Sequence, residues 1–394
     1  MVELVVEKVV YEGYGLARSC GQVFLIPFAA PGDLVKVRPV KERKGMVIAH
    51  IEKVIKPSNV RRFPPCPYYE RCGGCQLQHI DYHAQLEAKV GFVKESLERI
   101  GRIHWPHEIP IYYGDEFQYR LRTQLKQKRN GGGVSIGFYQ AGSNEICEIE
   151  SCMILSPALN GVIETLRSMP SVVGGDTAVE SIRLISAENG VVAAYPEVGR
   201  IRSDNVEIAS GGNRYLVGPT DFFQANRYLL SQLLEIVTGR ERGIRAVDLY
   251  CGVGFFSIAL ARRFEHVVAV ENNAHSVQLG RRNALRNRVS NIKFLAQSVE
   301  QWLATLKGER GKIDFVLVNP PRIGLSRQAI EGICDLKPSK LTYVSCNPAT
   351  LARDLKRLLA KNYEIVSIEA IDLLPQTYHV ETVVRLVDIA HRVG

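Results

Sequence analysis

The sequence predicts an α/β protein with a doubly wound, mostly parallel sheet in its carboxyl-terminal half, preceded by β-rich segments. From about residue 220, short apolar runs such as "RAVDLY", "HVVAVE" and "IDFVLV" alternate with segments of helical periodicity. That alternation is typical of parallel strands covered by helices. Residues 1–56 instead carry short β-rich runs separated by turn signals such as "APGD", which predict a small antiparallel barrel of the OB type.

Basic residues mark the predicted barrel, which fits a nucleic-acid-binding module, although a solvated strand face would show the same pattern. They are Lys36, Arg38, Lys41, Arg43 and Lys44. The following segment "KPSNVRRFPP" is rich in proline and polar residues, which indicates a linker.

A helix and then a β-rich region are predicted for the middle of the chain. Apolar residues at helical spacing predict a helix over residues 81–100, ending at Gly101, and β-rich sequence continues to about residue 217. Within "QYRLRTQLKQK" the alternation predicts a strand with one cationic face, for which a plain solvent-facing surface is an equal alternative. That face carries Arg120, Arg122, Gln124, Lys126 and Lys128, and the opposite face carries Leu121, Thr123 and Leu125.

Length and charge limit the class of protein. A chain of 394 residues accommodates two or three domains, and we place them at residues 1–57, 58–217 and 218–394. The net charge of +9 and pI near 9.0 favour a polyanionic partner, nucleic acid before membrane. No apolar run reaches the length of a membrane span, and the start "MVELVVEKVV" does not match a signal peptide, so a cytoplasmic location without a membrane partner is expected.

One cysteine stands where a strand becomes a helix. In "TYVSCNPATLARDL", Cys346 follows a β-branched run, and Asn347 with Pro348 forms a helix-start signal. The carboxyl ends of strands carry the ligand site in α/β proteins, and a following helix dipole lowers the pKa of a nearby thiol. These features predict a reactive thiol, against the alternative of a small buried side chain.

A glycine turn predicts a nucleotide-type site. In "VDLYCGVGFFSIALA", Asp248 ends a strand, while Gly252 and Gly254 allow a tight turn and close approach to a ligand. Glu271 ends the next strand, where a carboxylate accepts hydrogen bonds from ribose hydroxyls. The third glycine of a dinucleotide fingerprint is missing, so the pattern favours S-adenosylmethionine over NAD. A further strand end, "VLVNPPRIG", holds Asn319 in a stiff turn.

Cysteine spacing predicts a metal site, because nine cysteines in a reducing compartment are better explained by metal binding or catalysis than by disulfides. Cys66, Cys72 and Cys75 follow a C-x5-C-x2-C pattern, and Cys147 and Cys152 lie farther along. Three thiolates from one loop with a distant fourth suit a cuboidal iron–sulfur cluster. Zinc with four thiolates is the competing interpretation.

These motifs together resemble the RNA uridine carbon-5 methyltransferase family, which makes 5-methyluridine in 23S ribosomal RNA and in tRNA. The similarity runs nearly from end to end, through "CPYYERCGGCQLQH", "FFQAN", "DLYCGVGFFS", "NPPRIG", "SCNPATLARDL" and "PQTYHVETV". It implies a TRAM barrel at the amino terminus, a small central domain with an iron–sulfur cluster, and a Rossmann-like methyltransferase domain. The cysteine cluster makes the chain most similar to the 23S ribosomal RNA members.

The resemblance assigns roles to individual residues. It implies that Cys346 is the nucleophile and Glu381 the base. It implies that the methyl-donor site is lined by Gln224, Tyr250, Glu271 and the residue at position 319. It also implies that a [4Fe-4S] cluster is held by Cys66, Cys72, Cys75 and Cys152, with Cys147 as the alternative fourth ligand.

The chemistry of the reaction requires both a nucleophile and a base. Carbon 5 of uracil is a poor nucleophile, and a thiolate adding to carbon 6 makes it electron-rich. Carbon 5 must later lose its proton, which a partly desolvated carboxylate can accept. The target base must also leave its stack, and Phe222, Phe223 and Tyr250 are candidates to receive it, with core packing as the alternative.

One position departs from the family pattern, which has aspartate where this chain has Asn319. Asparagine keeps a carbonyl acceptor but loses the negative charge and gains a donor. From the resemblance as a whole we expect a monomeric enzyme that acts on 23S ribosomal RNA. The alternatives are a tRNA uridine or cytosine carbon-5 methyltransferase, a methyltransferase of exocyclic amino groups, and a non-catalytic RNA-binding homologue.

Overall fold

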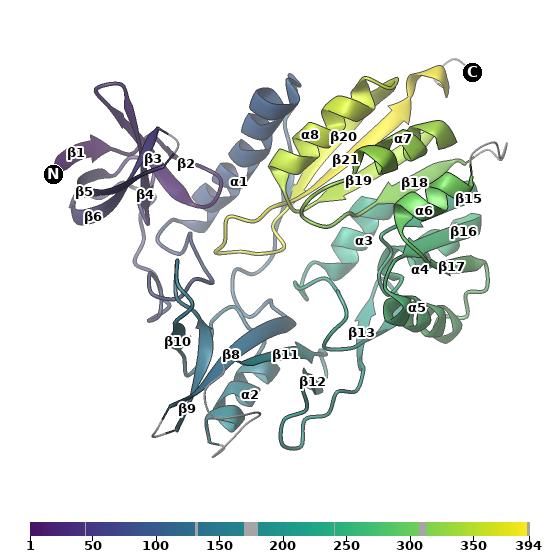
Figure 1. Ribbon diagram of the computed structural model, residues 1–394, viewed down its shortest axis with the longest axis horizontal. Coiled ribbons are helices and arrows are strands. Elements are labelled where there is room, and N and C mark those ends of the chain that lie inside the picture. Colours follow the sequence, from purple (N-terminus) through teal and green to yellow (C-terminus); the bar gives the residue numbers. More distant parts are fainter. Residues whose placement is uncertain (44, 131–132, 169–179, 240, 307–312, 392–394) are drawn as a thin grey trace.

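The computed structural model describes the chain except residues 44, 131–132, 169–179, 240, 307–312 and 392–394. It contains a six-stranded amino-terminal sheet, a five-stranded central sheet, a two-stranded hairpin and an eight-stranded carboxyl-terminal sheet (Figure 1). Within the described ranges, no helix has the length and apolar character needed to span a bilayer.

The amino-terminal sheet has the strand order β1-β5-β6-β4-β3-β2 and pairs antiparallel except between β4 and β6. It curls around its own apolar core, which includes Val6, Phe24 and Ile26. The predicted OB-type barrel is confirmed as a separate small β unit, while Lys44 of its basic set lies outside the described residues. The strands are β1 (Val2–Val5), β2 (Lys8–Val9), β3 (Tyr14–Ser19), β4 (Gln22–Pro27), β5 (Leu34–Arg43) and β6 (Met46–Lys56).

Residues 66–78, which we call the cysteine loop, contain Cys66, Cys72 and Cys75. The predicted helix after this loop is α1 (Tyr82–Ser96), which continues as a π-helical turn, η1 (Leu97–Gly101). Asp81 caps α1 by accepting from the amide of His83 at 3.0 Å. Val93 and Leu97 pack with residues of the carboxyl-terminal sheet and its helix α8 (Pro348–Leu359). This helix therefore docks on the carboxyl-terminal unit, although it precedes the central sheet in sequence.

The central sheet is antiparallel with the order β10-β9-β8-β11-β12. Its strands are β8 (Arg122–Asn130), β9 (Gly133–Tyr139), β10 (Ile146–Glu148), β11 (Glu180–Ser186) and β12 (Val192–Tyr195). Strand β8 shows the predicted alternation, since Leu121 and Leu125 are buried while Gln124 and Lys128 are exposed.

One helix in this region contradicts the sequence analysis, which expected only β-rich structure. Helix α2 (Pro157–Arg167) covers the central sheet, and Ser156 caps it by accepting from the amide of Leu159. Proline in the first turn and four buried apolar residues on one face stabilise it. The hairpin β13 (Val206–Ser210) and β14 (Asn213–Val217) follows and packs into the core of the carboxyl-terminal unit.

The carboxyl-terminal sheet has the order β17-β16-β15-β18-β19-β21-β20-β7, parallel from β17 to β19 and antiparallel around β21. Helices α3, α4 and α5 cover one face, and α6, α7 and α8 cover the other (Figure 1). The predicted doubly wound architecture is confirmed. The strands are β7 (Ile111–Tyr112), β15 (Gly243–Leu249), β16 (Phe264–Glu271), β17 (Ile292–Ala296), β18 (Phe315–Val318), β19 (Lys340–Ser345), β20 (Tyr363–Ile371) and β21 (Glu381–Asp388). The remaining helices are α3 (Leu230–Thr238), α4 (Phe255–Ala261), α5 (Ala274–Arg286), α6 (Val299–Thr305), α7 (Arg327–Leu336) and η2 (Ile389–His391).

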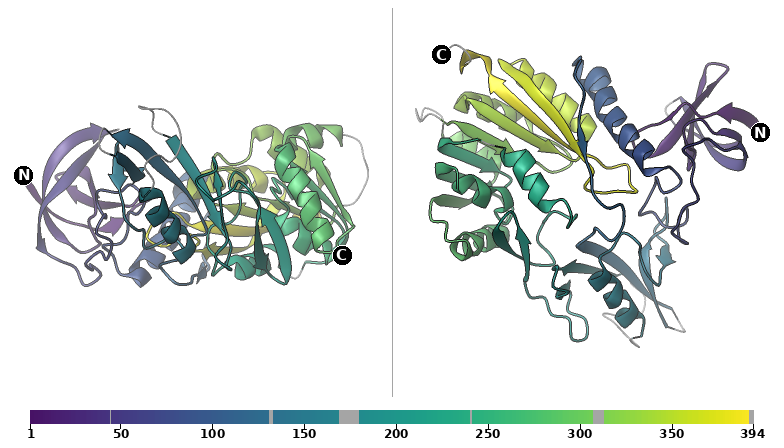
Figure 2. Two further views of the ribbon diagram at one scale, coloured as in Figure 1. Left: turned by 90° about the horizontal axis from the view of Figure 1, so that it is seen from below. Right: turned by 180° about the vertical axis from the view of Figure 1, so that it is seen from behind.

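Residues 372–380, which we call the hub loop, join β20 to β21 and contact most other parts of the chain. In Figure 2 this segment extends from the sheet toward α1 and the amino-terminal strands. The carbonyl of Gln376 accepts from the amides of Gln76 (2.9 Å) and Leu77 (3.0 Å) in the cysteine loop. The Tyr119 hydroxyl donates to the carbonyl of Pro375 at 3.0 Å. The hub loop thus links the barrel side, the central domain and the carboxyl-terminal sheet.

A buried ion pair fixes the start of the hub loop. Lys89 of α1 lies 2.5 Å from Asp372, and both side chains are 0% exposed. Tyr82 donates to the second oxygen of Asp372 at 3.1 Å, and Lys89 also donates to the carbonyl of Leu374. Burial lowers the pKa of Lys89 and raises that of Asp372, so each is stable as an ion only beside the other.

Replacing Lys89 with alanine should strongly destabilise the protein, because Asp372 would remain buried without its cation. The expected loss is roughly 3–5 kcal/mol in the free energy of unfolding, measured by urea denaturation. Glu95→Ala is the matched control on the same helix, because the Lys8–Glu95 pair is partly exposed and should be worth less than about 1 kcal/mol. Equal losses for the two variants would contradict this role of the buried pair.

Candidate active site

The register of two antiparallel strands brings Cys346 and Glu381 together. Strand β19 pairs with β21 so that Ser345 lies opposite Thr382. Continuing this register by one residue beyond β19 puts Cys346 opposite Glu381, and the Glu381 carboxylate is close enough to raise the pKa of the thiol. Residues directly opposite in antiparallel strands have their Cβ atoms about 4.5–5.5 Å apart. The predicted nucleophile and the predicted base therefore face each other at the carboxyl end of β19.

The start of helix α8 agrees with the sequence analysis. The Asn347 side chain accepts from the amide of Ala349 at 3.0 Å, and Pro348 occupies the first turn. Cys346 is thus the residue between the end of a strand and a helix cap. Its side chain is partly buried.

Arg322 is the third member of this cluster. Its carbonyl accepts from the Asn347 side-chain amide and from the Thr350 hydroxyl, both at 3.2 Å, which ties the turn after β18 to the first turn of α8. Its guanidinium faces the Cys346 thiol. A guanidinium nitrogen also donates to Nε2 of His379 at 3.1 Å.

The thiol is less acidic in the free protein than the sequence analysis expected. Burial and the nearby Glu381 carboxylate raise the pKa of Cys346 to about 11, although the charge of Arg322 opposes them. The expectation of a lowered pKa from the helix start was wrong, because desolvation and a like charge outweigh the dipole and the guanidinium. The thiol is therefore protonated at neutral pH until another group or the substrate changes its surroundings.

The pKa values of Glu381 and His379 are both shifted in the direction that favours the neutral form. Burial raises the pKa of Glu381 to about 8, against the opposing charge of Arg322. Burial and the same guanidinium lower the pKa of His379 to about 3. His379 is therefore neutral and accepts from Arg322 through Nε2. Its Nδ1 has no hydrogen-bond partner among the described residues.

The glycine turn after β15 surrounds Glu271. Tyr250, Gly252 and Gly254 have φ values of +64°, +54° and +84°, so the turn lies in the left-handed region. The Glu271 carboxylate accepts from the amides of Gly252 (3.1 Å) and Asn273 (2.8 Å), which orients it toward the turn. This leaves lone pairs that can accept from ribose hydroxyls.

The two glycines face different surroundings. The nearest atom to a Cβ at Gly252 would be the Phe222 carbonyl at 4.0 Å, so the space above this residue is open. A Cβ at Gly254 would lie 3.1 Å from the Phe294 ring, so close packing adds to the left-handed φ in favouring glycine there. Beneath the turn, burial raises the pKa of Asp248 to about 7, and Ser257 donates to its carboxylate at 2.5 Å.

The "FFQAN" segment borders the same turn. Phe222 is 65% exposed and stacks under the Arg122 guanidinium at 5.7 Å from the ring centroid, whereas Phe223 is 3% exposed and packs in the core. Gln224 is buried. The amide of Asn319 donates to the carbonyl of Leu249 at 3.3 Å, which places position 319 beside Tyr250 across two neighbouring strands. The structure thus places Tyr250, Glu271 and Asn319 at the carboxyl ends of neighbouring strands, and the Phe222 carbonyl of the "FFQAN" segment lies near Gly252.

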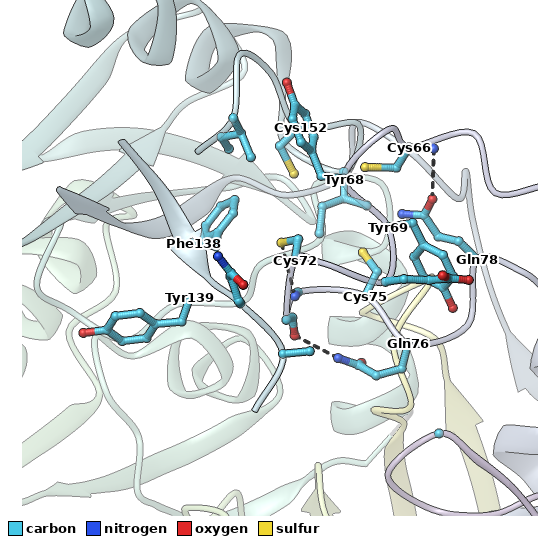
Figure 3. Close-up of a pocket in the computed structure, with 18 of the residues that line it drawn as sticks. Cys66, Tyr68, Tyr69, Cys72, Cys75, Gln76, Gln78, Phe138, Tyr139 and Cys152 are labelled. Carbon is cyan, nitrogen blue, oxygen red and sulfur yellow. Dashed lines mark hydrogen bonds between the residues drawn. The ribbon is translucent and has the colours of Figure 1, made fainter. Parts of the chain in front are cut away.

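The predicted metal ligands line a second site, a cavity of about 850 Å³ between the barrel, the cysteine loop and the central sheet. Figure 3 shows Cys66, Cys72, Cys75 and Cys152 around it. Burial raises the pKa of Cys72 to about 11 and that of Cys75 to about 12. All nine cysteines are free thiols. Within the described ranges, no three or more His, Cys, Asp or Glu side chains have the geometry to hold a single metal ion.

Cys147 lies near the predicted ligands, because Cys72 and Cys152 pack against the apolar cluster that contains it. It is buried in the apolar core of the central sheet and accepts from Nε of Arg71 at 3.3 Å. It does not line the cavity, whereas Cys152 does.

Comparison with known proteins identifies the family. Residues 203–389 match the tRNA (Uracil-5-)-methyltransferase family model, and residues 2–60 match the TRAM domain of tRNA (uracil(54)-C(5))-methyltransferase. The chain is 33% identical to an uncharacterized RNA methyltransferase of Aquifex aeolicus, covering 98% of both chains. It is 30% identical to the 23S rRNA (uracil(1939)-C(5))-methyltransferase RlmD of Aeromonas hydrophila, covering 97% of this chain and 95% of that protein.

The chain belongs to the RNA uracil-C5 methyltransferase family. It is an S-adenosylmethionine-dependent RNA methyltransferase with an amino-terminal TRAM domain. A solved structure agrees over the whole length: the Pyrococcus abyssi tRNA (uracil-54, C5)-methyltransferase in complex with S-adenosyl-L-homocysteine superposes with a TM-score of 0.76 and 26% identity, covering 98% of this chain and 100% of that one. The family resemblance inferred from the motifs is confirmed.

Some residues of this methyltransferase site were not singled out from the sequence. Asp221 accepts from the Ser276 hydroxyl at 3.1 Å and from the amide of Gly218 at 3.1 Å, which fixes the "FFQAN" segment against α5. Its position directly before that motif is the signal that was available. Tyr378 and Gln376 of the hub loop were also missed, because their contacts come from distant parts of the chain and leave no local pattern.

The rate at which Cys346 is alkylated should depend on the charges of Glu381 and Arg322. Glu381→Gln removes the carboxylate that raises the thiol pKa, so alkylation by iodoacetamide should shift to lower pH. Arg322→Gln should shift it to higher pH. Each shift should change the rate by roughly three- to tenfold at a fixed pH below the thiol pKa. The measurement is peptide mass spectrometry of carbamidomethylated Cys346 across a pH series.

Cys334 serves as an internal control in the same digests. Its pKa is also raised to about 11 by burial, but its charged neighbours are Lys361, Asp335, Asp388 and Glu331. It should therefore react alike in both variants. Shifts of Cys346 in one common direction would show that the two charged groups do not control the thiol.

Proposed function

We propose that this methyltransferase forms 5-methyluridine in RNA through a covalent bond between Cys346 and carbon 6 of the target uracil, with Glu381 removing the proton from carbon 5. The observation that carries the proposal is the cross-strand placement of the thiol opposite a partly buried carboxylate, with Arg322 beside them. A thiol and a carboxylate at this spacing reach neighbouring atoms of one ring.

The proposed reaction has three steps: addition of the thiolate, methyl transfer and elimination. The thiol loses its proton to solvent, with Arg322 stabilising the thiolate, and the sulfur–carbon 6 bond forms while the C5=C6 π electrons move toward carbon 5. Carbon 5 then takes the methyl group, and the bond between that methyl and the donor sulfonium breaks. Glu381 accepts the carbon 5 proton, the C5=C6 double bond is restored and the bond to Cys346 breaks. The raised pKa of Glu381 suits this role, because a base works best near the operating pH.

The residues present fit S-adenosylmethionine, which when bound supplies an electrophilic methyl group. The open space above Gly252 admits the donor, and the Glu271 carboxylate is oriented to accept from its ribose hydroxyls. Tyr250 and Asn319 lie beside this space, and we propose that they line the site together with the buried Gln224. The Asn319 carbonyl oxygen keeps the acceptor that aspartate would supply. Gly254 shapes the turn by packing on Phe294.

We propose 23S ribosomal RNA as the substrate and a monomer as the active form. RlmD relatives and the cysteine set support ribosomal RNA, whereas the Pyrococcus abyssi enzyme is a tRNA (uracil-54) methyltransferase. The exposed Phe222 beside Arg122 offers a stacking surface for an extruded base, and β8 presents basic residues for phosphates. In this arrangement residues 1–57 and 58–217 bind RNA, and residues 218–394 carry the chemistry.

We propose that Cys66, Cys72, Cys75 and Cys152 hold a [4Fe-4S] cluster. The four thiols line one cavity from two loops, and the lining by Cys152 but not Cys147 supports Cys152 as the fourth ligand. A cuboidal cluster is larger than one ion, so its thiolates stand farther apart than those around a single zinc. The four thiols line one cavity of about 850 Å³. When bound, the cluster cross-links the cysteine loop to the central sheet.

Cys346→Ala should abolish methyl transfer to a 23S ribosomal RNA transcript, since it removes the thiol proposed to add to carbon 6. Glu381→Gln should instead accumulate a protein–RNA adduct, because the carbon 5 proton stays in place. The measurements are transfer of a labelled methyl group, denaturing gel electrophoresis for the adduct, and nucleoside mass spectrometry of the product.

Cys334→Ala, on helix α7 away from the site, is the matched control and should retain activity. Ordinary turnover by Cys346→Ala would remove the nucleophile assignment. A product of 5-methylcytidine, or preference for a tRNA transcript, would replace the proposed substrate. Binding without transfer at saturating donor would indicate a non-catalytic homologue.

Anaerobically purified protein should be brown and contain about four iron and four sulfide per chain. Cys152→Ser should lose most of this iron, whereas Cys147→Ser should keep it because Cys147 lies in the core of the central sheet. Iron and sulfide analysis and the visible spectrum provide the readout. A colourless protein with bound zinc would overturn the iron assignment, and the opposite result for the two serine variants would make Cys147 the ligand.

A further inference from the structure

The TRAM barrel reaches the edge of the methyl-transfer site through one turn. Residues 10–13 connect β2 to β3, and the Tyr11 ring contacts two other parts of the chain. Its centroid lies 5.1 Å from that of Tyr378 in the hub loop and 6.0 Å from that of Phe92 on α1, both with nearly perpendicular rings. Edge-to-face pairs of this kind have a preferred geometry and contribute beyond simple burial.

The turn also packs closely against the cysteine loop. Gly13 has φ +85°, and a Cβ there would lie 2.8 Å from the Cβ of Gln76. Gln76 follows the last cysteine of the cysteine loop and donates its amide to the carbonyl of Gln376. The turn is therefore held between the cysteine loop and the hub loop, and it cannot shift without moving one of them.

A short series of contacts connects Tyr11 to the thiol. The Tyr378 ring lies 4.2 Å from that of His379. His379 accepts from Arg322 at 3.1 Å, and Arg322 is tied to Asn347, the neighbour of Cys346. Because the Arg322 side chain is exposed, its hydrogen bond to His379, whose ring packs on that of Tyr378, is a contact that orients the guanidinium.

We propose that Tyr11, carried by the TRAM barrel, is a positioning residue for the methyl-transfer site: its ring holds Tyr378 and thereby the His379–Arg322 pair against the Cys346 thiol. In this proposal the barrel binds RNA and also controls the reactivity of the Cys346 thiol, through the contact between Tyr11 and Tyr378. The proposal rests on the proposed role of Cys346, and it adds a contribution from a different domain.

The ring of Tyr11, and not its hydroxyl, carries this role. No described residue forms a hydrogen bond with the hydroxyl, whereas the ring makes both aromatic contacts. The titratable groups around Tyr11 are Tyr378, Cys346, Arg322 and Glu12, and those around the thiol are Glu381 and Arg322. Of these, only Arg322 lowers the pKa of the thiol, so displacing it makes Cys346 less reactive.

The test compares Tyr11→Ala and Tyr11→Leu with Tyr11→Phe in the full-length protein. Alkylation of Cys346 by iodoacetamide in the free protein, followed across a pH series, should slow roughly three- to tenfold at a fixed pH in the alanine and leucine variants. The phenylalanine variant should match the wild type because it keeps the ring. Leucine keeps apolar bulk in the cluster, so it preserves the docking if alanine does not fold.

Steady-state kinetics with an RNA transcript separate positioning from RNA binding. Tyr11→Leu should lower kcat, while Arg38→Ala, an exposed basic residue of the same barrel, should leave the alkylation profile unchanged and act only on the KM for RNA. An unchanged alkylation profile in both Tyr11→Ala and Tyr11→Leu would overturn the proposal, as would an effect confined to KM.

The two proposals fail in different ways. Normal methyl transfer by Cys346→Ala would end the nucleophile assignment, yet the alkylation profile would still show whether Tyr11 controls the thiol. Loss of activity in Cys346→Ala with no alkylation change in the Tyr11 variants would keep the proposed function and remove the role of the barrel.

Discussion

The hub loop depends on a buried ion pair, and the rest of the structure depends on the hub loop. Lys89 and Asp372 lie in full burial, where neither charge is stable without the other. This pair fixes the first residue of a nine-residue segment that ends next to Glu381. Between those points the segment receives hydrogen bonds from the cysteine loop through Gln376 and from the central domain through Tyr119. The position of Glu381, the proposed base, is therefore set jointly by three parts of the chain.

Desolvation dominates the electrostatics of the site. It raises the pKa of both the thiol and the carboxylate, so the pair is largely uncharged in the free enzyme near neutral pH. Two negative charges at this distance would repel each other, and Arg322 is the cation nearest to both. In the proposed mechanism, this arrangement would keep Cys346 protonated in the free enzyme. Because His379 is neutral, it can orient the guanidinium without competing with it for charge.

The position of the cysteine loop would give the proposed cluster a structural role, since methyl transfer involves no electron transfer. The residues directly after Cys75 donate to the hub loop, and Gly13 of the barrel packs against the same segment. Thiolate ligands from two loops would therefore stabilise the surface on which the barrel, the central sheet and the hub loop meet. A [4Fe-4S] cluster there would act at a distance from the thiol through packing.

Local patterns in the sequence determined the doubly wound sheet, the barrel, the cap at Asn347 and the family, because strand periodicity, helix capping and glycine turns depend on near neighbours. They missed helix α2, whose apolar spacing lies inside a β-rich region. Only the tertiary structure placed Cys346 opposite Glu381, separated Cys147 from the cavity and brought Tyr11 to the site. It also reversed the expected pKa shift of the thiol, since burial and an approaching carboxylate are properties of folded packing that a strand-to-helix motif does not contain.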